Sequence, residues 1–271
     1  MEDLKVAAAV MRCVVGRKPE NLARMEALVR EAARRGSQAI CFPEMNLSGY
    51  ALRQEMGSFA EPIPGPSTEA VLKMARECNL LILAGLAERA GTGRYFISHF
   101  AAGPEGLIGI YRKIHLGPPE EGIFQGGTEC PVFSFGRTQF GMELCFDGHF
   151  PELSTLLALK GAEVIFIPHA SPRESEGEKK TRWLRYLPAR AYDSSVFLVA
   201  CNLLGETESG MAFPGGAIVL GPKGEILAES RDGREEIILA ELKSDKLRSV
   251  KENSKGFFLA RRRPDVYRKI T

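Results

Sequence analysis

The sequence predicts an α/β fold in which two β-sheets pack together and helices cover them on the outside. Apolar runs typical of strands recur along the whole chain and number about a dozen, which is many for one sheet. Between several of these runs, apolar residues recur at helical spacing. A chain of 271 residues can bury a large core, and no repeat, low-complexity tract or long linker divides it. We therefore expect one domain over residues 1–271.

The first elements predict a β-α-β unit. Residues 4–15 form an apolar strand, and a helix follows in which Pro19 suits the first turn and Gly36 can end the last one. Residues 39–42 are continuously apolar, as expected of a strand covered on both faces. Such a unit is right-handed when its strands share a sheet. Glu44 follows the second strand at its carboxyl end, where α/β sheets tend to bind ligands.

The rest of the chain continues the alternation of strands and helices. Residues 103–106, Gly-Pro-Glu-Gly, predict a turn, and Pro188 is expected to kink a helix over 179–193. Further apolar runs predict strands at 80–86, 95–102, 107–111, 139–144, 164–167, 196–201, 217–220, 225–227 and 237–242. The remaining helices are expected after Ser67, over 153–159 and after Ser244.

Composition and charge are ordinary for a soluble globular protein. Apolar residues make up 44% of the chain and charged residues 26%, which is ordinary. The formal charge is +2, and no basic tract is interleaved with aromatic residues, so nucleic acid is not an expected partner. No apolar run approaches the length of a membrane span. The N-terminal residues lack a signal-peptide layout, so we expect a cytoplasmic protein with no membrane partner.

The six cysteines predict neither a disulfide framework nor a zinc site. No two of them form a Cys-x-x-Cys motif, and no histidine lies at metal-ligand spacing from one. Four of them lie within or beside apolar runs and are interpreted as small core residues: Cys13, Cys41, Cys78 and Cys201. We accordingly expect no metal site.

Three reactive side chains each stand at the end of their own strand. Cys145 follows the strand at 139–144 and precedes a helix opened by residues 150–152. Backbone N–H groups and the positive end of a helix both favour the thiolate of such a cysteine. Glu44 and Lys113 likewise follow apolar runs, and a surface ion pair has no reason to follow buried strands. These positions predict one constructed site.

The order Glu44, Lys113, Cys145 and the residues around each make the chain resemble the nitrilase superfamily of carbon–nitrogen hydrolases. The matching stretches are 42–50, 111–116 and 141–152, with weaker ones at 189–191, Asn202, 215–216 and 262–267. The resemblance implies a four-layer αββα sandwich with two central mixed β-sheets. It also implies a homodimer or higher homo-oligomer, paired through the outer helices, and a site that needs no metal or organic cofactor.

The resemblance also assigns roles to the three groups. It implies that Glu44 is the general base, that Lys113 stabilises the oxyanion and that Cys145 is the nucleophile. The superfamily carries a second glutamate in the loop after the lysine. Glu121 matches that position best, and the adjacent Glu120 remains the alternative.

General chemistry leads to the same reaction. A free thiol near neutral pH is only a few per cent thiolate, so a neighbouring base helps it attack. The tetrahedral oxyanion needs fixed donors, which Lys113 and the backbone N–H of Phe146 would supply. Expulsion of ammonia or an amine leaves a thioester, which water then releases. The sequence therefore predicts cysteine-dependent hydrolysis of a non-peptide C–N bond in a small linear amide or N-carbamoyl compound.

Four residues are candidates for the substrate pocket. Tyr50 closes the first motif, and His149 stands four residues after Cys145, where many relatives carry arginine. His169 ends a strand on the expected active face and could equally be structural. Arg173 is hypothesised to bind an acidic end of the substrate as a carboxylate fork, although the alternating charges around it also predict a solvated loop.

Several alternatives stay open at this point. His115 or His149 could be the base of a Cys-His hydrolase, since histidine is the commonest general base. Nitrile hydrolysers usually carry tryptophan where this chain has Phe146, which favours the amide and N-carbamoyl branches over a nitrilase. An acyltransferase and a catalytically silent binding protein complete the list. The tail over 253–271 is expected at a subunit interface, with an acidic partner as the alternative.

Overall fold

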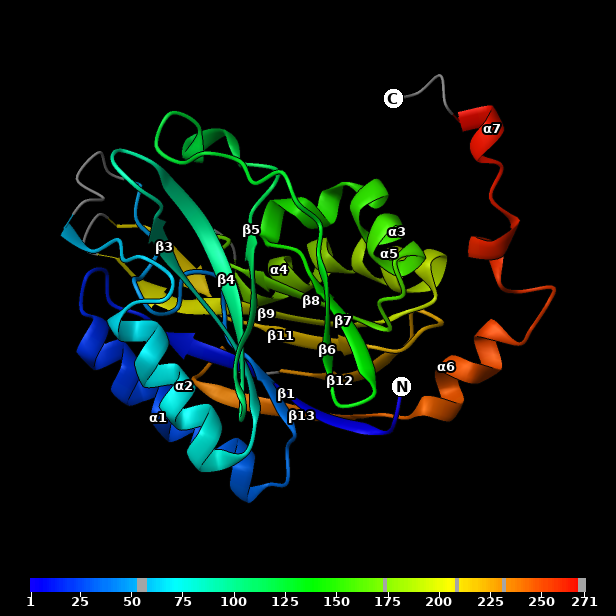
Figure 1. Ribbon diagram of the computed structural model, residues 1–271, viewed down its shortest axis with the longest axis horizontal. Helices are drawn as coiled ribbons and strands as arrows, with labels where there is room; N and C mark the ends of the chain where they lie inside the picture. Colours follow the sequence, from blue (N-terminus) through cyan, green and yellow to red (C-terminus); the bar gives the residue numbers. More distant parts are fainter. Residues whose placement is uncertain (53–57, 173–174, 208–209, 231–232, 268–271) are drawn as a thin grey trace.

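The computed structural model describes residues 1–52, 58–172, 175–207, 210–230 and 233–267 (Figure 1). The strands are β1 (Leu4–Arg12), β2 (Ala39–Cys41), β3 (Leu81–Arg89), β4 (Tyr95–Gly103), β5 (Gly106–Arg112), β6 (Val132–Phe135), β7 (Thr138–Met142), β8 (Val164–His169), β9 (Phe197–Glu206), β10 (Ala212–Pro214), β11 (Ala217–Leu220), β12 (Ile226–Glu229) and β13 (Glu236–Leu242). The helices are α1 (Lys18–Arg34), α2 (Pro66–Cys78), α3 (Pro151–Leu159), α4 (Glu176–Trp183), α5 (Leu187–Ser194), α6 (Ser244–Lys251) and α7 (Pro264–Tyr267). Within these ranges, no helix has both the length and the apolar character needed to cross a bilayer.

The described strands are hydrogen-bonded into one mixed sheet. Its main path runs β5-β4-β3-β2-β1-β9-β8-β7-β6, with β13 on β1 and β10, β11 and β12 around β9. A short parallel pairing of Met11 and Arg12 with Leu203 and Leu204 joins the two halves. The expectation of two separate sheets is therefore wrong. Twisted strands let one large sheet curl until its halves face each other, which accommodates the strand number without a second sheet.

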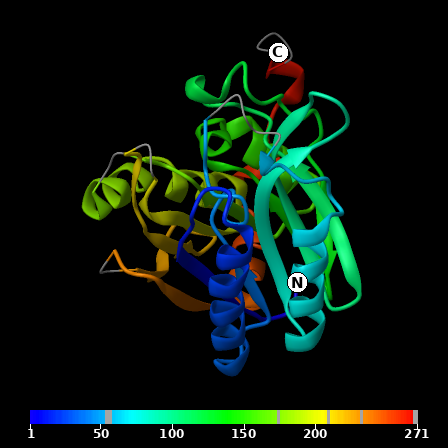
Figure 2. The same cartoon turned by 90° about the vertical axis from the view of Figure 1, so that its left-hand side faces the viewer.

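Helices cover the outside of both halves, as expected. On one half α1 and α2 lie side by side against β1–β5, and on the other α3, α4 and α5 cover β8, β9 and β11 (Figures 1 and 2). Strand β1 shows how the two faces are divided. Val6, Ala8 and Val10 point into the core between the halves. Ala7 and Ala9 point to the helices α1 and α2, as the two-residue period of a strand requires.

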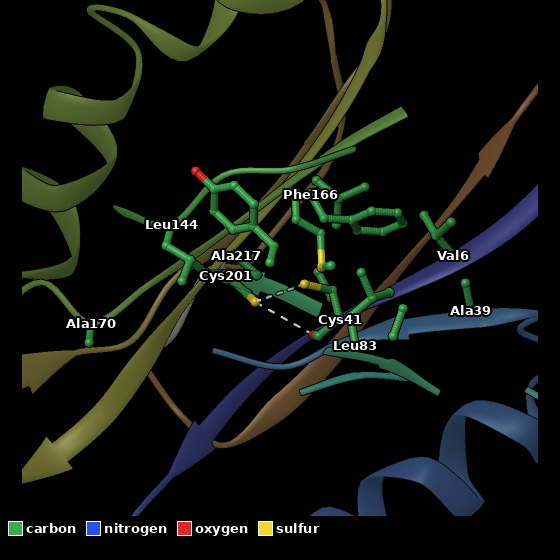
Figure 3. Close-up of a cluster of buried hydrophobic side chains, with 14 of the residues drawn as sticks. Val6, Ala39, Cys41, Leu83, Leu144, Phe166, Ala170, Cys201 and Ala217 are labelled. Atoms are coloured by element: carbon green, nitrogen blue, oxygen red, sulfur yellow. Dashed lines mark hydrogen bonds between the residues drawn. The ribbon is translucent and has the colours of Figure 1, made fainter. Parts of the chain in front are cut away.

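The core between the halves is closely packed and contains two thiols. Figure 3 shows Val6 and Leu83 from one half opposite Phe166 from the other. Cys201 lies with its sulfur 3.9 Å from that of Cys41, and both side chains are fully buried (Figure 3). All six cysteines are free thiols. The two halves therefore meet through apolar packing over most of their length.

The sheet brings the ends of four strands to one edge. Strands β1, β2 and β3 are parallel, and β5 returns to the same direction through the antiparallel β4. Strands β7, β8 and β9 are parallel to one another, and β9 is parallel to β1. The carboxyl ends of β2, β5, β7 and β8 therefore share one edge of the curled sheet. They are followed by Glu44, Lys113, Cys145 and Ala170.

The helix expected over 179–193 is two helices rather than one kinked helix. Helix α4 ends at Trp183, and α5 begins at Leu187 with Pro188 in its first turn. Proline lacks the N–H that a helix interior needs, but the first turn does not use it. Pro188 therefore starts a new helix, and Trp183 lies at the end of α4.

The C-terminal segment leaves the sheet and runs past the outer helices (Figure 1). After α6 a short 3-10 turn, Phe258–Arg261, brings the ring of Phe258 to 5.7 Å from that of Tyr192 on α5. Val266 and Tyr267 in α7 are exposed. The location of residues 253–271 at a subunit interface stays a prediction.

A buried carboxyl group lies between β7 and α3. Glu143 is fully buried, and its Oε1 accepts a hydrogen bond of 2.6 Å from the hydroxyl of Ser154. Burial raises the pKa of Glu143 from 4.5 to about 8, the charge of Asp147 adds to the rise, and Ser154 and Arg190 oppose it. Glu143 is therefore uncharged at neutral pH.

We expect Glu143→Gln to stabilise the protein at pH 8 but not at pH 5. Because the pKa is higher in the folded state, the unfolded chain ionises while the folded chain does not as pH rises from about 4.5 to 8, and stability is lost over that window. Glutamine does not titrate, so its advantage grows to the order of 2 kcal/mol. Denaturant unfolding at both pH values measures it. An equal difference at pH 5 and pH 8 contradicts the assignment, and the exposed Glu121→Gln is the control.

Candidate active site

Two buried carboxylates hold one buried ammonium group. Nζ of Lys113 donates to Oε1 of Glu44 at 2.9 Å and to Oε1 of Glu120 at 2.8 Å. Glu44 is fully buried, Lys113 is 1% exposed and Glu120 is 3% exposed. The hydroxyl of Tyr50 donates to the same Glu120 oxygen at 2.9 Å. The structure therefore unites Glu44, Lys113 and Tyr50, and burial rules out a solvated surface ion pair.

The backbone around Glu44 fixes the direction of its carboxylate. The N–H of Ala170 donates to Oε2 of Glu44 at 2.9 Å, and the N–H of Glu44 donates to the carbonyl of His169. The next residue, Met45, has a positive φ of 55°, which is uncommon for a residue other than glycine. Asn46 accepts from the N–H of Gly85 at 2.8 Å. One carboxylate oxygen thus faces Lys113 while the other is held by the end of β8.

The nucleophile candidate begins a tight turn. Cys145 opens a 3-10 turn that extends to His149, and its φ is +46°. Such strained backbone is frequent at active sites. Asp147 secures the turn, because its carboxylate accepts from the N–H of Leu144 at 3.0 Å, from the hydroxyl of Tyr111 at 2.7 Å and from the N–H of His115 at 2.8 Å. Asp147 therefore ties the turn of Cys145 to the strand that leads to Lys113.

The hydroxyl of Ser171 lies next to the sulfur. Its Oγ is 3.3 Å from Sγ of Cys145. The N–H of Ser171 donates to Oδ1 of Asn202 at 2.8 Å, and Nδ2 of Asn202 donates to the carbonyl of Gly215 at 3.1 Å. Sequence reasoning did not identify Asp147 or Ser171. Asp147 lies within the matching stretch 141–152, but only its hydrogen-bond partners in the structure show what it does.

The surroundings of Cys145 favour the thiol over the thiolate. Burial raises the pKa of the Cys145 thiol, the charge of Glu44 raises it further, and Lys113, Lys179 and the Ser171 hydroxyl oppose the rise. Desolvation therefore outweighs the nearby donors that favour the thiolate. A base is needed to remove the proton.

Glu44 has the acid–base properties of that base. Burial raises its pKa from 4.5 to about 7, Lys113 lowers it and the negative charge of Glu120 raises it. Burial alone would lower the pKa of Lys113, but Glu44, Cys145 and Glu120 outweigh it, so the pKa lies above its ordinary value. Lys113 therefore stays positive, while Glu44 can accept and return a proton near neutral pH.

The glutamate that contacts Lys113 is Glu120 and not the adjacent Glu121. The 3-10 turn over Pro118–Glu120 directs Glu120 inward, where its other oxygen accepts from the N–H of Gly117 at 2.7 Å. Glu121 has extended backbone and an exposed side chain. The sequence match pointed to Glu121, one residue too far along the chain. Two adjacent glutamates differ only in the direction of their side chains, and the backbone turn decides which one points inward.

The three histidines near the site have other partners. Nδ1 of His115 is 2.8 Å from Oδ1 of Asp147, and its ring stacks on Phe150. The ring of His149 packs against Tyr186 and Phe146. The buried His169 is described below. Since the structure gives the sulfur of Cys145 the hydroxyl of Ser171 as a hydrogen-bond partner, it supports no Cys-His pair.

The rings of His169, Trp183 and Tyr186 contact one another on the side of the site towards α4. Nδ1 of His169 lies 2.7 Å from the carbonyl of Ile167, which makes Nδ1 the protonated nitrogen. Nε2 of His169 then accepts from Nε1 of Trp183 at 3.1 Å and lies 3.2 Å from the hydroxyl of Tyr186. Burial lowers the pKa of His169 well below its ordinary value, so the ring is neutral. Arg173 lies outside the described residues.

Lys179 is the other buried cation near the site. It is 3% exposed, and its ammonium nitrogen lies 4.9 Å from the ring centroid of Trp183. The sequence assigned Lys179 no role, because residue type alone does not distinguish a buried lysine from one on an exposed helix surface. Throughout the described part of the chain, no three His, Cys, Asp or Glu side chains are grouped so that they could hold a metal ion.

The chain is similar to known proteins over almost its full length. The carbon–nitrogen hydrolase family model matches residues 5–252. A nitrilase from Pyrococcus abyssi is 33% identical over 274 residues, which cover 97% of this chain and 99% of that protein. An N-carbamoylputrescine amidase from Arabidopsis thaliana is 33% identical over 268 residues, which cover 92% of this chain and 89% of that one.

Solved structures confirm the fold. A variant of the amidase from Nesterenkonia sp. AN1 superposes with a TM-score of 0.86 at 22% identity, covering 99% of this chain and 97% of that one. A carbon–nitrogen hydrolase from Helicobacter pylori superposes with a TM-score of 0.89 at 22% identity, covering 99% and 98%. In another form of the Nesterenkonia amidase, the acetamide moiety of fluoroacetamide is bound covalently to the active-site cysteine. Together with the sequence match, these findings establish that the chain belongs to the carbon–nitrogen hydrolases of the nitrilase superfamily.

Proposed function

We propose that Cys145 hydrolyses the C–N bond of a small linear amide or N-carbamoyl compound through a thioester. The observation that carries this proposal is the buried Glu44–Lys113–Glu120 group beside the strained turn of Cys145. A buried cation between two carboxylates is costly to desolvate, and such perturbed groups concentrate at functional sites. Relatives named amidases and N-carbamoylputrescine amidases support the choice of bond.

The first half-reaction begins with proton transfer. Glu44 takes the proton of the Cys145 thiol as sulfur attacks the substrate carbonyl carbon. Lys113 and the backbone N–H of Phe146, in the first turn after Cys145, stabilise the oxygen that becomes negative. Protonated Glu44 then gives its proton to the leaving nitrogen, so ammonia or an amine departs and the acyl group stays on sulfur.

The second half-reaction releases the acid. Glu44, ionised again, takes a proton from water as the water attacks the thioester carbon. The same donors stabilise the second tetrahedral oxygen, and sulfur leaves with the proton from Glu44. Glu120 touches neither bond; it keeps Lys113 charged and in place, and Tyr50 fixes Glu120 in turn. Glu120 is thus a positioning residue in this scheme.

A nitrile hydrolase remains the second candidate, because one relative is named a nitrilase and is as similar as the amidases. With a nitrile, the Cys145 sulfur would add to the nitrile carbon to give a thioimidate. One water would then displace ammonia to give the same thioester, and a second water would release the acid. An acyltransferase would differ only in replacing water by another amine. A panel of amides, N-carbamoyl compounds and nitriles, assayed for ammonia and acid, separates these activities.

Replacing the nucleophile tests the central step. Cys145→Ala should reduce ammonia release from the best amide by at least about 1000-fold, because the covalent route is lost. Mass spectrometry of the wild type with fluoroacetamide should show an adduct on Cys145 that the variant lacks. Cys78→Ala, which alters a half-buried thiol at the end of α2, should keep both activity and adduct. Hydrolysis that survives in Cys145→Ala rules out the proposal.

The pH dependence tests the base. Because Glu44 must be ionised to accept the thiol proton, kcat/KM should increase as pH rises through about 7 and level off above it. Rates from pH 5 to 9 with one neutral amide measure this limb, and circular dichroism over the same range separates it from unfolding. A flat profile across pH 7 would exclude Glu44 as the base.

Two adjacent glutamates provide a matched test of the second carboxylate. Glu120→Gln removes one of the two charges that hold Lys113, and kcat should fall on the order of 100-fold. Glu121→Gln makes the same chemical change on an exposed neighbour, and its kcat should stay within about twofold of the wild type. The reverse order of effects would restore Glu121 as the functional residue.

A further inference from the structure

The hydroxyl of Ser171 is in direct contact with the sulfur of Cys145. Its Oγ lies 3.3 Å from Sγ, and either atom could be the donor of the hydrogen bond between them. That freedom ends when the sulfur loses its proton, because a thiolate can only accept. From that moment the Ser171 O–H donates and Sγ accepts. The contact therefore changes from a weak hydrogen bond into a charge-assisted one when the thiol is deprotonated.

One buried amide side chain holds the backbone of Ser171. The N–H of Ser171 donates to Oδ1 of Asn202 at 2.8 Å, and Nδ2 of Asn202 donates to the carbonyl of Ser171 at 3.4 Å. The same Nδ2 also donates to the carbonyl of Gly215 at 3.1 Å, and Asn202 is fully buried. Asn202 therefore fixes the position of Ser171, and its hydroxyl is within reach of Sγ before any substrate binds.

The residue before Ser171 holds the proposed general base. The N–H of Ala170 donates to Oε2 of Glu44 at 2.9 Å. Ala170 and Ser171 directly follow β8, so one short segment contacts Glu44 through its first residue and the sulfur of Cys145 through its second. The end of β8 therefore aligns the group that accepts the proton with the atom that gives it up.

The sulfur of Cys145 needs stabilisation when it becomes negative. Burial raises the pKa of its thiol, and the charge of Glu44 raises it further. Lys113 and Lys179 lower this pKa through their charges, and the Ser171 hydroxyl lowers it through a direct hydrogen bond. The ammonium group of Lys113 is already shared between two carboxylates. A donor in contact with Sγ therefore acts where desolvation makes the negative charge most costly.

We propose that Ser171 is a further catalytic residue of this site, whose hydroxyl donates to the Cys145 sulfur whenever that atom carries negative charge. The inference rests on the proposed hydrolase function. In the first half-reaction Glu44 takes the thiol proton, and Ser171 keeps its own proton while it stabilises the attacking sulfur. In the second, the C–S bond breaks, its electron pair returns to sulfur, and the same O–H donates to it until Glu44 returns a proton. Because a neutral thiol or thioester accepts only weakly, the contact stabilises the charged sulfur more than either neutral form.

Alkylation of Cys145 measures this stabilisation without any substrate. Iodoacetamide reacts with the thiolate, so the rate constant at each pH reports how much thiolate is present. In Ser171→Ala the midpoint of the pH profile should move upward by about one unit, and the rate constant at pH 7 should fall roughly 10-fold. Mass spectrometry of the Cys145 peptide separates this thiol from the other free cysteines. Since Glu44, Lys113 and Lys179 are present in both proteins, the difference measures the hydroxyl.

Two variants of similar side-chain volume separate the hydroxyl from packing. Ser171→Thr keeps the hydroxyl and Ser171→Val replaces it with a methyl group, so kcat should be at least about 10-fold higher in Ser171→Thr at similar KM. Ser249→Ala removes an exposed hydroxyl on α6, and it should leave the alkylation profile and kcat unchanged. An unchanged profile in Ser171→Ala, or equal kcat in Ser171→Thr and Ser171→Val, overturns the proposal. A difference confined to KM also overturns it, because Ser171 would then only bind the substrate.

Alkylation and hydrolysis together distinguish failure of this inference from failure of the proposed function. If the wild type hydrolyses no C–N bond but Ser171→Ala shifts the alkylation profile, the reaction is wrong and stabilisation of the thiolate by Ser171 stands. If the wild type hydrolyses an amide, and Ser171→Ala changes neither the profile nor kcat, the hydrolase function stands and the role of Ser171 is wrong.

Discussion

The structure of the site depends on one buried ion cluster, in which Lys113 is held between Glu44 and Glu120. Burial is the main reason why Glu44 can take a proton near neutral pH; Lys113 opposes the rise in its pKa and the charge of Glu120 adds to it. The same cluster keeps Lys113 positive in a place where burial would otherwise discharge it. The charges of Glu44 and Lys113 therefore influence each other's protonation state.

The curled sheet explains how such a cluster forms from distant residues. Glu44 and Lys113 follow strands of one half, and Cys145 follows a strand of the other. Parallel direction through both halves places these ends at a common edge, and Asp147 then joins the turn of Cys145 to Tyr111 and His115. The fold thus supplies approximate positions, and a few side-chain hydrogen bonds supply the final alignment.

The sequence predicted most strands and helices, but not β6, β10 or α7. It also singled out Glu44, Lys113 and Cys145, because each follows an apolar run and so leaves a local signal. It did not predict features that depend on the direction of one backbone turn, and this explains why Glu121 was favoured over Glu120. Lys179 had no signal at all, because burial of a lysine is decided by tertiary packing. The single sheet was missed for a similar reason, since the pairing of residues 11–12 with 203–204 is invisible in either strand alone.

The short pairing between β1 and β9 has a consequence for how the protein loses activity. The two halves are joined there by only a few backbone hydrogen bonds, and elsewhere they meet through apolar contact and through the hydrogen bonds of Glu44 and Asp147. Separating the halves would move the Cys145 sulfur away from Glu44 without requiring either half to lose its own strands and helices. Inactivation by heat or pressure should consequently follow separation of the two halves, while most of the secondary structure is still intact.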